Sequence, residues 1–191
     1  MNARIIPNLL TIGRIVAVPP LIWLLLNGHH GWALALAVAA GVSDLLDGWL
    51  ARRFDWQSRF GSFADPAADK LLMVGCYLTL GWLGELVWWV VTLVILRDVV
   101  IVIGAFVYHR LFAPVEAQPT QLSRFNTFCQ IFLMWFVLIR LAGFPMPEQA
   151  QIGLEWLVAF MAVVTLTQYV WLWSVKAART GRKGKGSAGA R

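Results

Sequence analysis

The chain has 191 residues, of which 59% are hydrophobic and only 14% charged, and its 16 Lys and Arg outnumber its 10 Asp and Glu. Soluble domains carry about 45–50% apolar and about 25% charged residues, so this composition argues against a water-soluble fold and against extensive disorder. The two cysteines, Cys76 and Cys129, lie inside apolar runs, and no disulfide framework is predicted.

Six apolar stretches reach the length of about 20 residues that a helix needs to cross a bilayer. They cover residues 8–27, 32–54, 62–84, 86–112, 122–142 and 151–175. We therefore predict an all-α integral membrane protein with six transmembrane helices and a short interfacial N-terminal segment, forming one domain over residues 1–175. The first stretch lacks a small-residue cleavage site, which favours a retained helix over a signal peptide.

Lys and Arg are distributed unevenly between the predicted loops. With the N-terminus inside, the outer loops at 28–31, 82–87 and 143–150 contain neither residue, whereas the inner segments contain several. This positive-inside pattern predicts that both termini are cytoplasmic. Residues 176–191 are basic and rich in Gly and Ala, so we predict a disordered tail that is attracted to anionic lipid headgroups.

Four aspartates lie in the second and third stretches, where an ionised Asp costs about 2.5–3.5 kcal/mol and is a candidate for function. Asp44 and Asp47 are three residues apart and share one helix face. Asp65 and Asp69 are four apart and do the same. Because a short loop joins the two helices, we expect antiparallel neighbours whose carboxylates converge near the inner interface. Two Mg²⁺ or Mn²⁺ ions would offset the repulsion there.

Small and basic residues accompany the aspartates. Gly48 and Gly61 leave room for a phosphate to approach the backbone. Gly61 and Ser62 open the third helix, whose positive end favours an anion. Arg52 lies one turn beyond Gly48, where its guanidinium can neutralise a phosphate oxygen. Together these residues predict a diphosphate-binding site.

The pattern D-x-x-D-G-x-x-A-R-x(8)-G-x(3)-D-x(3)-D is complete between Asp44 and Asp69. It resembles the signature of the CDP-alcohol phosphatidyltransferases, and the resemblance extends over about residues 5–175. It implies phospholipid synthesis by metal-dependent transfer of a phosphatidyl group from CDP-diacylglycerol to a glycerol-type alcohol, with release of CMP. The implied metal ligands are Asp44, Asp47, Asp65 and Asp69, with Asp69 as general base. The implied CDP site contains Gly48, Ala51, Arg52, Gly61 and Ser62.

The opening Ile6-Pro7-Asn8-Leu9-Leu10-Thr11, followed by Arg14, is similar to that of phosphatidylglycerophosphate synthases and of eukaryote-type cardiolipin synthases. In both groups this segment lies near the nucleotide, so Asn8 and Thr11 are implied to bind CDP. Alternatively, either residue caps the helix start. Arg14 lies inside an apolar run, where a charged residue is harder to explain by a structural role alone.

Arg97-Asp98-Val99 and Arg124-Phe125-Asn126-Thr127 look closer to the cardiolipin synthase branch, which typically has Lys where this chain has Arg124. The resemblance favours phosphatidylglycerol as acceptor, giving cardiolipin; glycerol 3-phosphate, giving phosphatidylglycerophosphate, is the alternative. Both acceptors carry a phosphate, so we expect Arg97, Arg124 and Arg110 to bind it. The structural alternatives are a buried Arg97–Asp98 pair and an interfacial anchor at Arg110.

The implied partners are CDP-diacylglycerol, the phosphate-bearing acceptor and the lipid bilayer, and family members are commonly homodimers. We expect no nucleic-acid partner, and we expect a bacterial inner membrane with the active site facing the cytoplasm. A cation carrier or channel lined by the aspartates is a remote alternative of another class. This alternative assigns no role to Gly48, Gly61 or Arg52. A cation path would also need acidic residues at several depths of the bilayer, whereas these aspartates lie near one interface.

Overall fold

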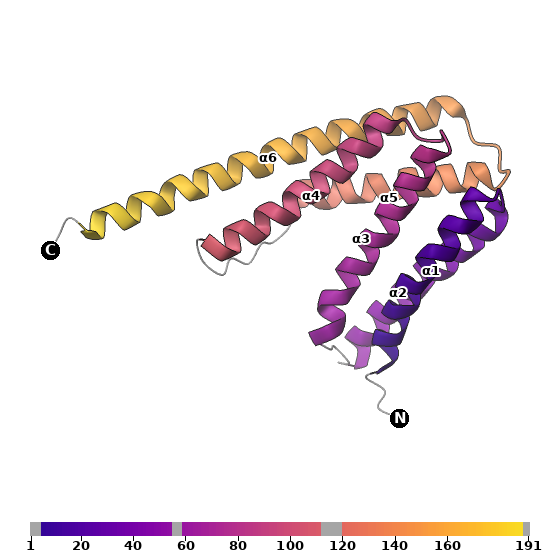
Figure 1. Ribbon diagram of the computed structural model, residues 1–191, viewed down its shortest axis with the longest axis horizontal. Helices are drawn as coiled ribbons and strands as arrows, with labels where there is room; N and C mark the ends of the chain where they lie inside the picture. The colour runs from indigo at the N-terminus through magenta and orange to yellow at the C-terminus, as the bar shows by residue number, and fades with distance from the viewer. Residues whose placement is uncertain (1–4, 55–58, 112–119, 189–191) are drawn as a thin grey trace. The chain divides into compact units, whose positions relative to one another are not determined.

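The computed structural model describes residues 5–54, 59–111 and 120–188, and every regular element in these ranges is an α-helix. Side chains are described for residues 11–46, 49, 53–54, 68–104 and 120–172. The helices are α1 (Ile5–Leu26), α2 (His30–Phe54), α3 (Arg59–Trp82), α4 (Trp88–Leu111), α5 (Gln121–Leu141) and α6 (Glu148–Ala188) (Figure 1). Each helix coincides with one of the six predicted apolar stretches, so the all-helical prediction is confirmed.

Three of the helix ends share one geometry. Gly28, Gly84 and Gly143 follow α1, α3 and α5 with φ of 74°, 77° and 96°, a left-handed conformation that glycine adopts without strain. At the first of these ends, the N–H of His29 donates to the carbonyl of Leu24 at 2.9 Å, and the N–H of Gly28 donates to that of Leu25. The same pair of bonds recurs after α3 and α5. These are Schellman turns, which stop a helix and reverse the chain.

The chain divides into two compact units, of which the first contains residues 1–87 and 134–151. Within it, α1 packs against both α2 and α3 (Figure 1). The sequence had suggested α2 and α3 as direct partners; α1 is their shared neighbour. On α2 the buried face consists of Ala33, Ala37 and Ala40, small residues that let helices approach closely.

The contact between α1 and α3 is tight at Gly75. A Cβ added there would lie 3.2 Å from both the Val18 Cγ1 and the Ile22 Cδ1 atoms of α1. The remaining core between these helices is apolar and includes Leu21, Leu25 and Tyr77, all fully buried. Gly75 therefore sets the distance at which α3 can pack on α1.

Within the first unit, polar groups connect the C-terminal ends of α3 and α5. Arg140 in the last turn of α5 forms an ion pair with Glu85, which follows α3. The Nε2 of Gln151 donates to the Glu85 carbonyl at 2.6 Å. These contacts tie together two of the Schellman turns.

The second unit contains residues 88–133 and 152–191. Thr120 is the N-cap of α5, since its Oγ1 accepts the N–H of Ser123 at 3.2 Å. The N–H of Thr120 donates to the Tyr169 Oη at 3.4 Å, and its Oγ1 donates to Gln168 Oε1 at 3.2 Å. The cap thus fixes the start of α5 against α6.

Two helical segments, Gln121–Leu141 and Glu148–Leu172, are long and apolar enough to cross a membrane by length and composition. Shorter apolar segments are Thr11–Leu26 and His30–Leu46. Large apolar side chains are exposed in both units; examples are Val16, Trp23, Trp32, Trp82, Val102, Phe128, Phe160 and Trp171. Such extensive apolar exposure is unfavourable in water and suits contact with lipid.

Two further predictions can be compared with the structure. Cys76 and Cys129 are free and buried, as expected for thiols inside apolar runs. α6 continues as a helix to Ala188 and so includes most of the segment 176–191 that we predicted to be disordered. Gly181, Gly184 and Gly186 are poor helix formers, but the Ala, Lys and Arg around them are good ones, and extending an existing helix avoids the cost of nucleation.

Candidate active site

The aspartates of the sequence pattern lie on two helices joined by residues 55–58. Asp44 lies 10 residues before Phe54, the last residue of α2. Asp69 lies 10 residues after Arg59, the first residue of α3. In antiparallel helices, equal distances from the connected ends place residues at one level. The backbones of Asp47 and Asp65 belong to the same two helices, and their side chains lie outside the described ones.

Arg14 of α1 joins the two described aspartates. Its Nη2 lies 2.6 Å from Asp44 Oδ1, and its Nη1 lies 2.7 Å from Asp69 Oδ1. Both are short, charge-assisted contacts of the kind that a guanidinium fork makes with carboxylates. We call Arg14, Asp44 and Asp69 the Arg14 fork. The convergence expected from the sequence is thus observed for the first and last aspartates of the pattern.

The members of the fork differ in burial. The Arg14 side chain is 3% exposed, whereas those of Asp44 and Asp69 are 44% and 52% exposed. The cation therefore lies on the inner side of the carboxylates, which face outward. Within the fork itself, two carboxylates face one guanidinium, which leaves one negative charge in excess on the exposed side. That side attracts a further cation.

Thr11 lies one turn before Arg14 on α1 and is buried, with 1% of its surface exposed. Residues three apart on a helix are neighbours, so Thr11 shares the inner face of α1 with Arg14. This places one of the residues implied to bind CDP beside the fork. The other, Asn8, has a side chain outside the described ones.

A second buried charge lies in the other unit. Arg97 of α4 donates from Nη1 to Asp98 Oδ1 at 2.6 Å, from Nε to Thr165 Oγ1 at 3.3 Å and from Nη2 to Ser123 Oγ. Arg97 and Asp98 are 3% and 6% exposed. The guanidinium thereby connects α4, α5 and α6. These contacts favour the structural alternative that the sequence left open for the Arg97–Asp98 pair.

The residues after Ser123 on α5 differ in their exposure. The Arg124 side chain is exposed, as the predicted contact with the acceptor phosphate requires. Asn126 is fully buried, and neither of its amide atoms has a hydrogen-bond partner among the described residues. A buried amide without a partner costs about 1–3 kcal/mol. Asn126 is therefore a candidate for contact with a bound ligand.

Several predicted site residues have side chains outside the described ones. These residues are Asn8, Asp47, Gly48, Ala51, Arg52, Gly61, Ser62, Asp65 and Arg110. Conversely, sequence reasoning assigned no role to Arg14. The available signal was its position inside an apolar run, where a cation needs a counter-charge nearby.

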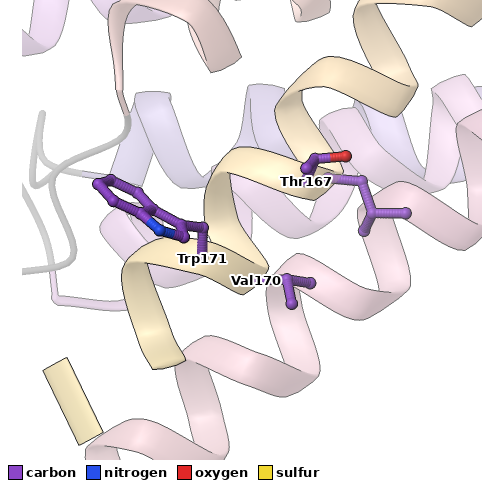
Figure 2. Close-up of a pocket in the computed structure, with 4 residues that line it drawn as sticks. Thr167, Val170 and Trp171 are labelled. Atoms are coloured by element: carbon purple, nitrogen blue, oxygen red, sulfur yellow. The ribbon is translucent and has the colours of Figure 1, made fainter. Parts of the chain in front are cut away.

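One open groove of about 420 Å³ lies along α6 and is lined by Leu166, Thr167, Val170 and Trp171. Figure 2 shows Thr167 and, one turn further along this helix, the adjacent residues Val170 and Trp171. None of the described residues that line the groove is acidic or basic. They are mainly apolar, and the candidate catalytic groups are not among them.

The fork suits a hard divalent cation. Carboxylate oxygens are the ligands that Mg²⁺ and Mn²⁺ prefer, and two such groups from separate helices meet here with their outer sides exposed. Among the described side chains, which do not include those of Asp47 and Asp65, no group of three or more metal-ligating residues is present. The donor chemistry of the pattern therefore fits a metal site.

Comparison with known proteins matches residues 4–179 to the family model described as CDP-alcohol phosphatidyltransferase. The resemblance found in the sequence is thereby confirmed. A Drosophila melanogaster protein named probable cardiolipin synthase (CMP-forming) is 33% identical over 185 residues, which cover 88% of this chain and 58% of that protein. A Mycobacterium tuberculosis protein named probable phosphatidylglycerophosphate synthase is 33% identical over 178 residues, covering 88% and 82%.

A cardiolipin synthase (CMP-forming) of Streptomyces coelicolor is 35% identical over 111 residues, which cover 55% of this chain and 52% of that protein. The chain thus spans about half the length of the cardiolipin synthases that it matches. Relatives with both names occur, so similarity alone does not distinguish the two acceptors.

Proposed function

The chain belongs to the CDP-alcohol phosphatidyltransferase family, and we propose that it transfers the phosphatidyl group of CDP-diacylglycerol to phosphatidylglycerol, forming cardiolipin and releasing CMP. The observation that carries the proposal is the Arg14 fork, which brings the first and last aspartates of the family pattern to one place. Relatives named cardiolipin synthase are compatible with this acceptor, and a relative named phosphatidylglycerophosphate synthase keeps glycerol 3-phosphate as the alternative.

In this proposal Asp44, Asp47, Asp65 and Asp69 hold two divalent cations, Mg²⁺ or Mn²⁺. When bound, these ions supply positive charge to the diphosphate that is being cleaved. Gly48, Gly61 and Ser62 let the diphosphate approach the backbone, and Arg52 neutralises one of its oxygens. Asn8, Thr11 and Ala51 complete the CDP site.

Asp69 is the proposed general base. Its carboxylate is 52% exposed, so a bound alcohol can reach it. It accepts the proton of the acceptor's primary hydroxyl, and the oxygen attacks the phosphorus that carries the diacylglycerol. As the new P–O bond forms, the bond between that phosphorus and the bridging oxygen breaks, and its electron pair leaves with CMP.

The charges in the second unit favour phosphatidylglycerol over glycerol 3-phosphate. Near neutral pH a phosphate monoester carries about −1.5 to −2 charges, whereas the phosphodiester of phosphatidylglycerol carries one. Arg97 is already balanced by Asp98, which leaves Arg124 as the exposed cation among the described side chains of this unit. One exposed guanidinium suits one negative charge. We therefore assign the acceptor phosphate to Arg124. Arg97 instead holds α4 against α5 and α6.

We further propose an integral membrane protein with six transmembrane helices, cytoplasmic termini and a cytoplasmic active site in a bacterial inner membrane. The six apolar helices, the uneven distribution of Lys and Arg and the exposed apolar side chains support this arrangement. Arg110 then lies near the inner interface, where we propose that it acts as an anchor. A homodimer, which the family resemblance implies, remains a prediction.

The proposal is tested with purified protein and CDP-diacylglycerol, offered phosphatidylglycerol and glycerol 3-phosphate in separate reactions. Mass spectrometry of the lipid products should find cardiolipin with the first acceptor and far less product with the second. Formation of phosphatidylglycerophosphate alone would reassign the acceptor while preserving the reaction class. Absence of CMP release with either acceptor would contradict the proposed function.

A further inference from the structure

We infer that Arg14 is a positioning residue for the divalent-cation site: its guanidinium holds Asp44 and Asp69 from the buried side, so that their exposed sides face the cation together. The inference rests on the proposed function, because it presupposes that these aspartates bind metal. It adds a residue that lies outside the aspartate pattern and on a third helix.

The contacts support a holding role. Arg14 reaches Asp44 and Asp69 through different terminal nitrogens, at 2.6 and 2.7 Å, so both carboxylates are bonded to one rigid planar group. Without this cation, two carboxylates brought together from α2 and α3 would repel each other. Hydrogen-bonded partners behind metal ligands commonly change metal affinity about 10- to 100-fold.

The alternative is that the guanidinium occupies the cation's own place and must leave before metal binds. Burial decides against this alternative. A group that fills a solvent-accessible cation site should be at least as exposed as its ligands, but the Arg14 side chain is 3% exposed against 44% and 52% for the carboxylates. Arg14 lies behind the ligands, and the cation can approach from the opposite side.

The position of Arg14 is fixed by the packing of α1. Val18, one turn further along, is in tight contact with α3 at Gly75. α1 also packs along α2. The guanidinium therefore starts from a backbone that both aspartate-bearing helices contact. A lysine at this position would carry the charge but not the two-pronged planar geometry.

Mn²⁺ binding, measured by electron paramagnetic resonance on purified protein without lipid substrate, tests the inference. Arg14→Ala should weaken Mn²⁺ binding by roughly 10- to 100-fold, and Arg14→Lys should give an intermediate affinity. Arg140→Ala is the matched control, because it removes an ion pair in the same unit that does not contact the aspartates; its affinity should equal that of the wild type. Helix content and elution volume report whether each variant folds.

The outcomes separate the two proposals. Wild-type protein that binds Mn²⁺ while Arg14→Ala binds it equally or more tightly would overturn the positioning role and leave the proposed reaction standing. If Arg14→Ala does not fold, Arg14→Lys provides the test. An Mn²⁺ affinity equal to that of the wild type in Arg14→Lys would overturn the claim that a planar guanidinium must hold the two carboxylates. Wild-type protein that binds no Mn²⁺ would contradict the proposed metal site itself and, with it, this inference.

Discussion

Arg14 on α1 and Asp69 on α3 are 55 positions apart in the chain, yet a hydrogen bond of 2.7 Å joins Nη1 of the arginine to Oδ1 of the aspartate. This bond, with its counterpart to Asp44, links the helix that opens the chain to the two helices that carry the family pattern. A buried cation and two outward-facing carboxylates form one unit, and changes in any member should affect the others.

Asp69→Asn should abolish CMP release while leaving CDP-diacylglycerol binding largely intact, because Asp44, Asp47 and Asp65 remain as ligands of the proposed cations. The amide keeps the shape of the side chain but cannot accept the proton of the acceptor hydroxyl. Single-turnover CMP release and equilibrium binding of the nucleotide lipid measure the two effects separately. Loss of binding in parallel with loss of turnover would argue against the role of Asp69 as base.

Removal of divalent cations should silence the enzyme reversibly. Excess EDTA should stop CMP release, and added Mg²⁺ or Mn²⁺ should restore it, because four carboxylates at the diphosphate repel it without cations. CMP release is followed before and after readdition of metal. Full activity that persists in excess EDTA would contradict the metal pair.

Arg124→Ala should raise the KM for phosphatidylglycerol much more than the KM for CDP-diacylglycerol. The exposed guanidinium is assigned to the acceptor phosphate and not to the nucleotide. Steady-state kinetics with each substrate varied in turn measure both constants, and Arg124→Lys, which keeps the charge, should recover part of the loss. An equal rise in both KM values would remove Arg124 from the acceptor site.

Arg97→Ala should instead destabilise the protein, because it leaves the buried Asp98 carboxylate without its ion-pair partner. Breaking a buried pair on one side costs about 3–5 kcal/mol. Replacing both Arg97 and Asp98 by Leu should recover much of the loss. Thermal unfolding in detergent compares the single and double variants. A single variant as stable as the wild type would show that Arg97 does not stabilise the contacts of α4 with α5 and α6.

Gly75→Val should separate α1 from α3, since even one added carbon would lie 3.2 Å from Val18 and from Ile22. Overpacking of this kind costs about 1–3 kcal/mol. Because Arg14 is carried by the displaced helix, Mn²⁺ affinity should fall with stability. Gly31→Val is the control, as no atom lies within 4 Å of its added Cβ. Unchanged stability in Gly75→Val would contradict the close packing.

The sequence predicted the helices well because each depends on a local property, the length of an apolar run. It also predicted that Asp44 and Asp69 meet, since the short connection and the helical spacing fix their level. The Arg14 fork could not be predicted in this way. It depends on α1 packing against both aspartate-bearing helices, which is a tertiary relationship without a local pattern.

The two arginines of the expected acceptor cluster show a second limit. Arg97 and Arg124 were both expected to bind the acceptor phosphate, with a buried Arg97–Asp98 pair as the structural alternative for the first. The structure buries Arg97 among Asp98, Ser123 and Thr165 and leaves Arg124 exposed. Asp98 neutralises Arg97 from the same helix, but the burial of the pair depends on contacts with Ser123 and Thr165 from two other helices, which the sequence does not reveal.

The glycine turns after α1, α3 and α5 have a consequence for how the chain enters a bilayer. Each turn is preset by a local conformation, so neighbouring helices can insert as pairs, with the reversal already formed. In the proposed topology the loops that cross the lipid, 28–31, 82–87 and 143–150, contain no Lys or Arg. Translocating a turn whose hydrogen bonds are already formed exposes fewer polar groups to hydrocarbon, which lowers the barrier to insertion for each pair.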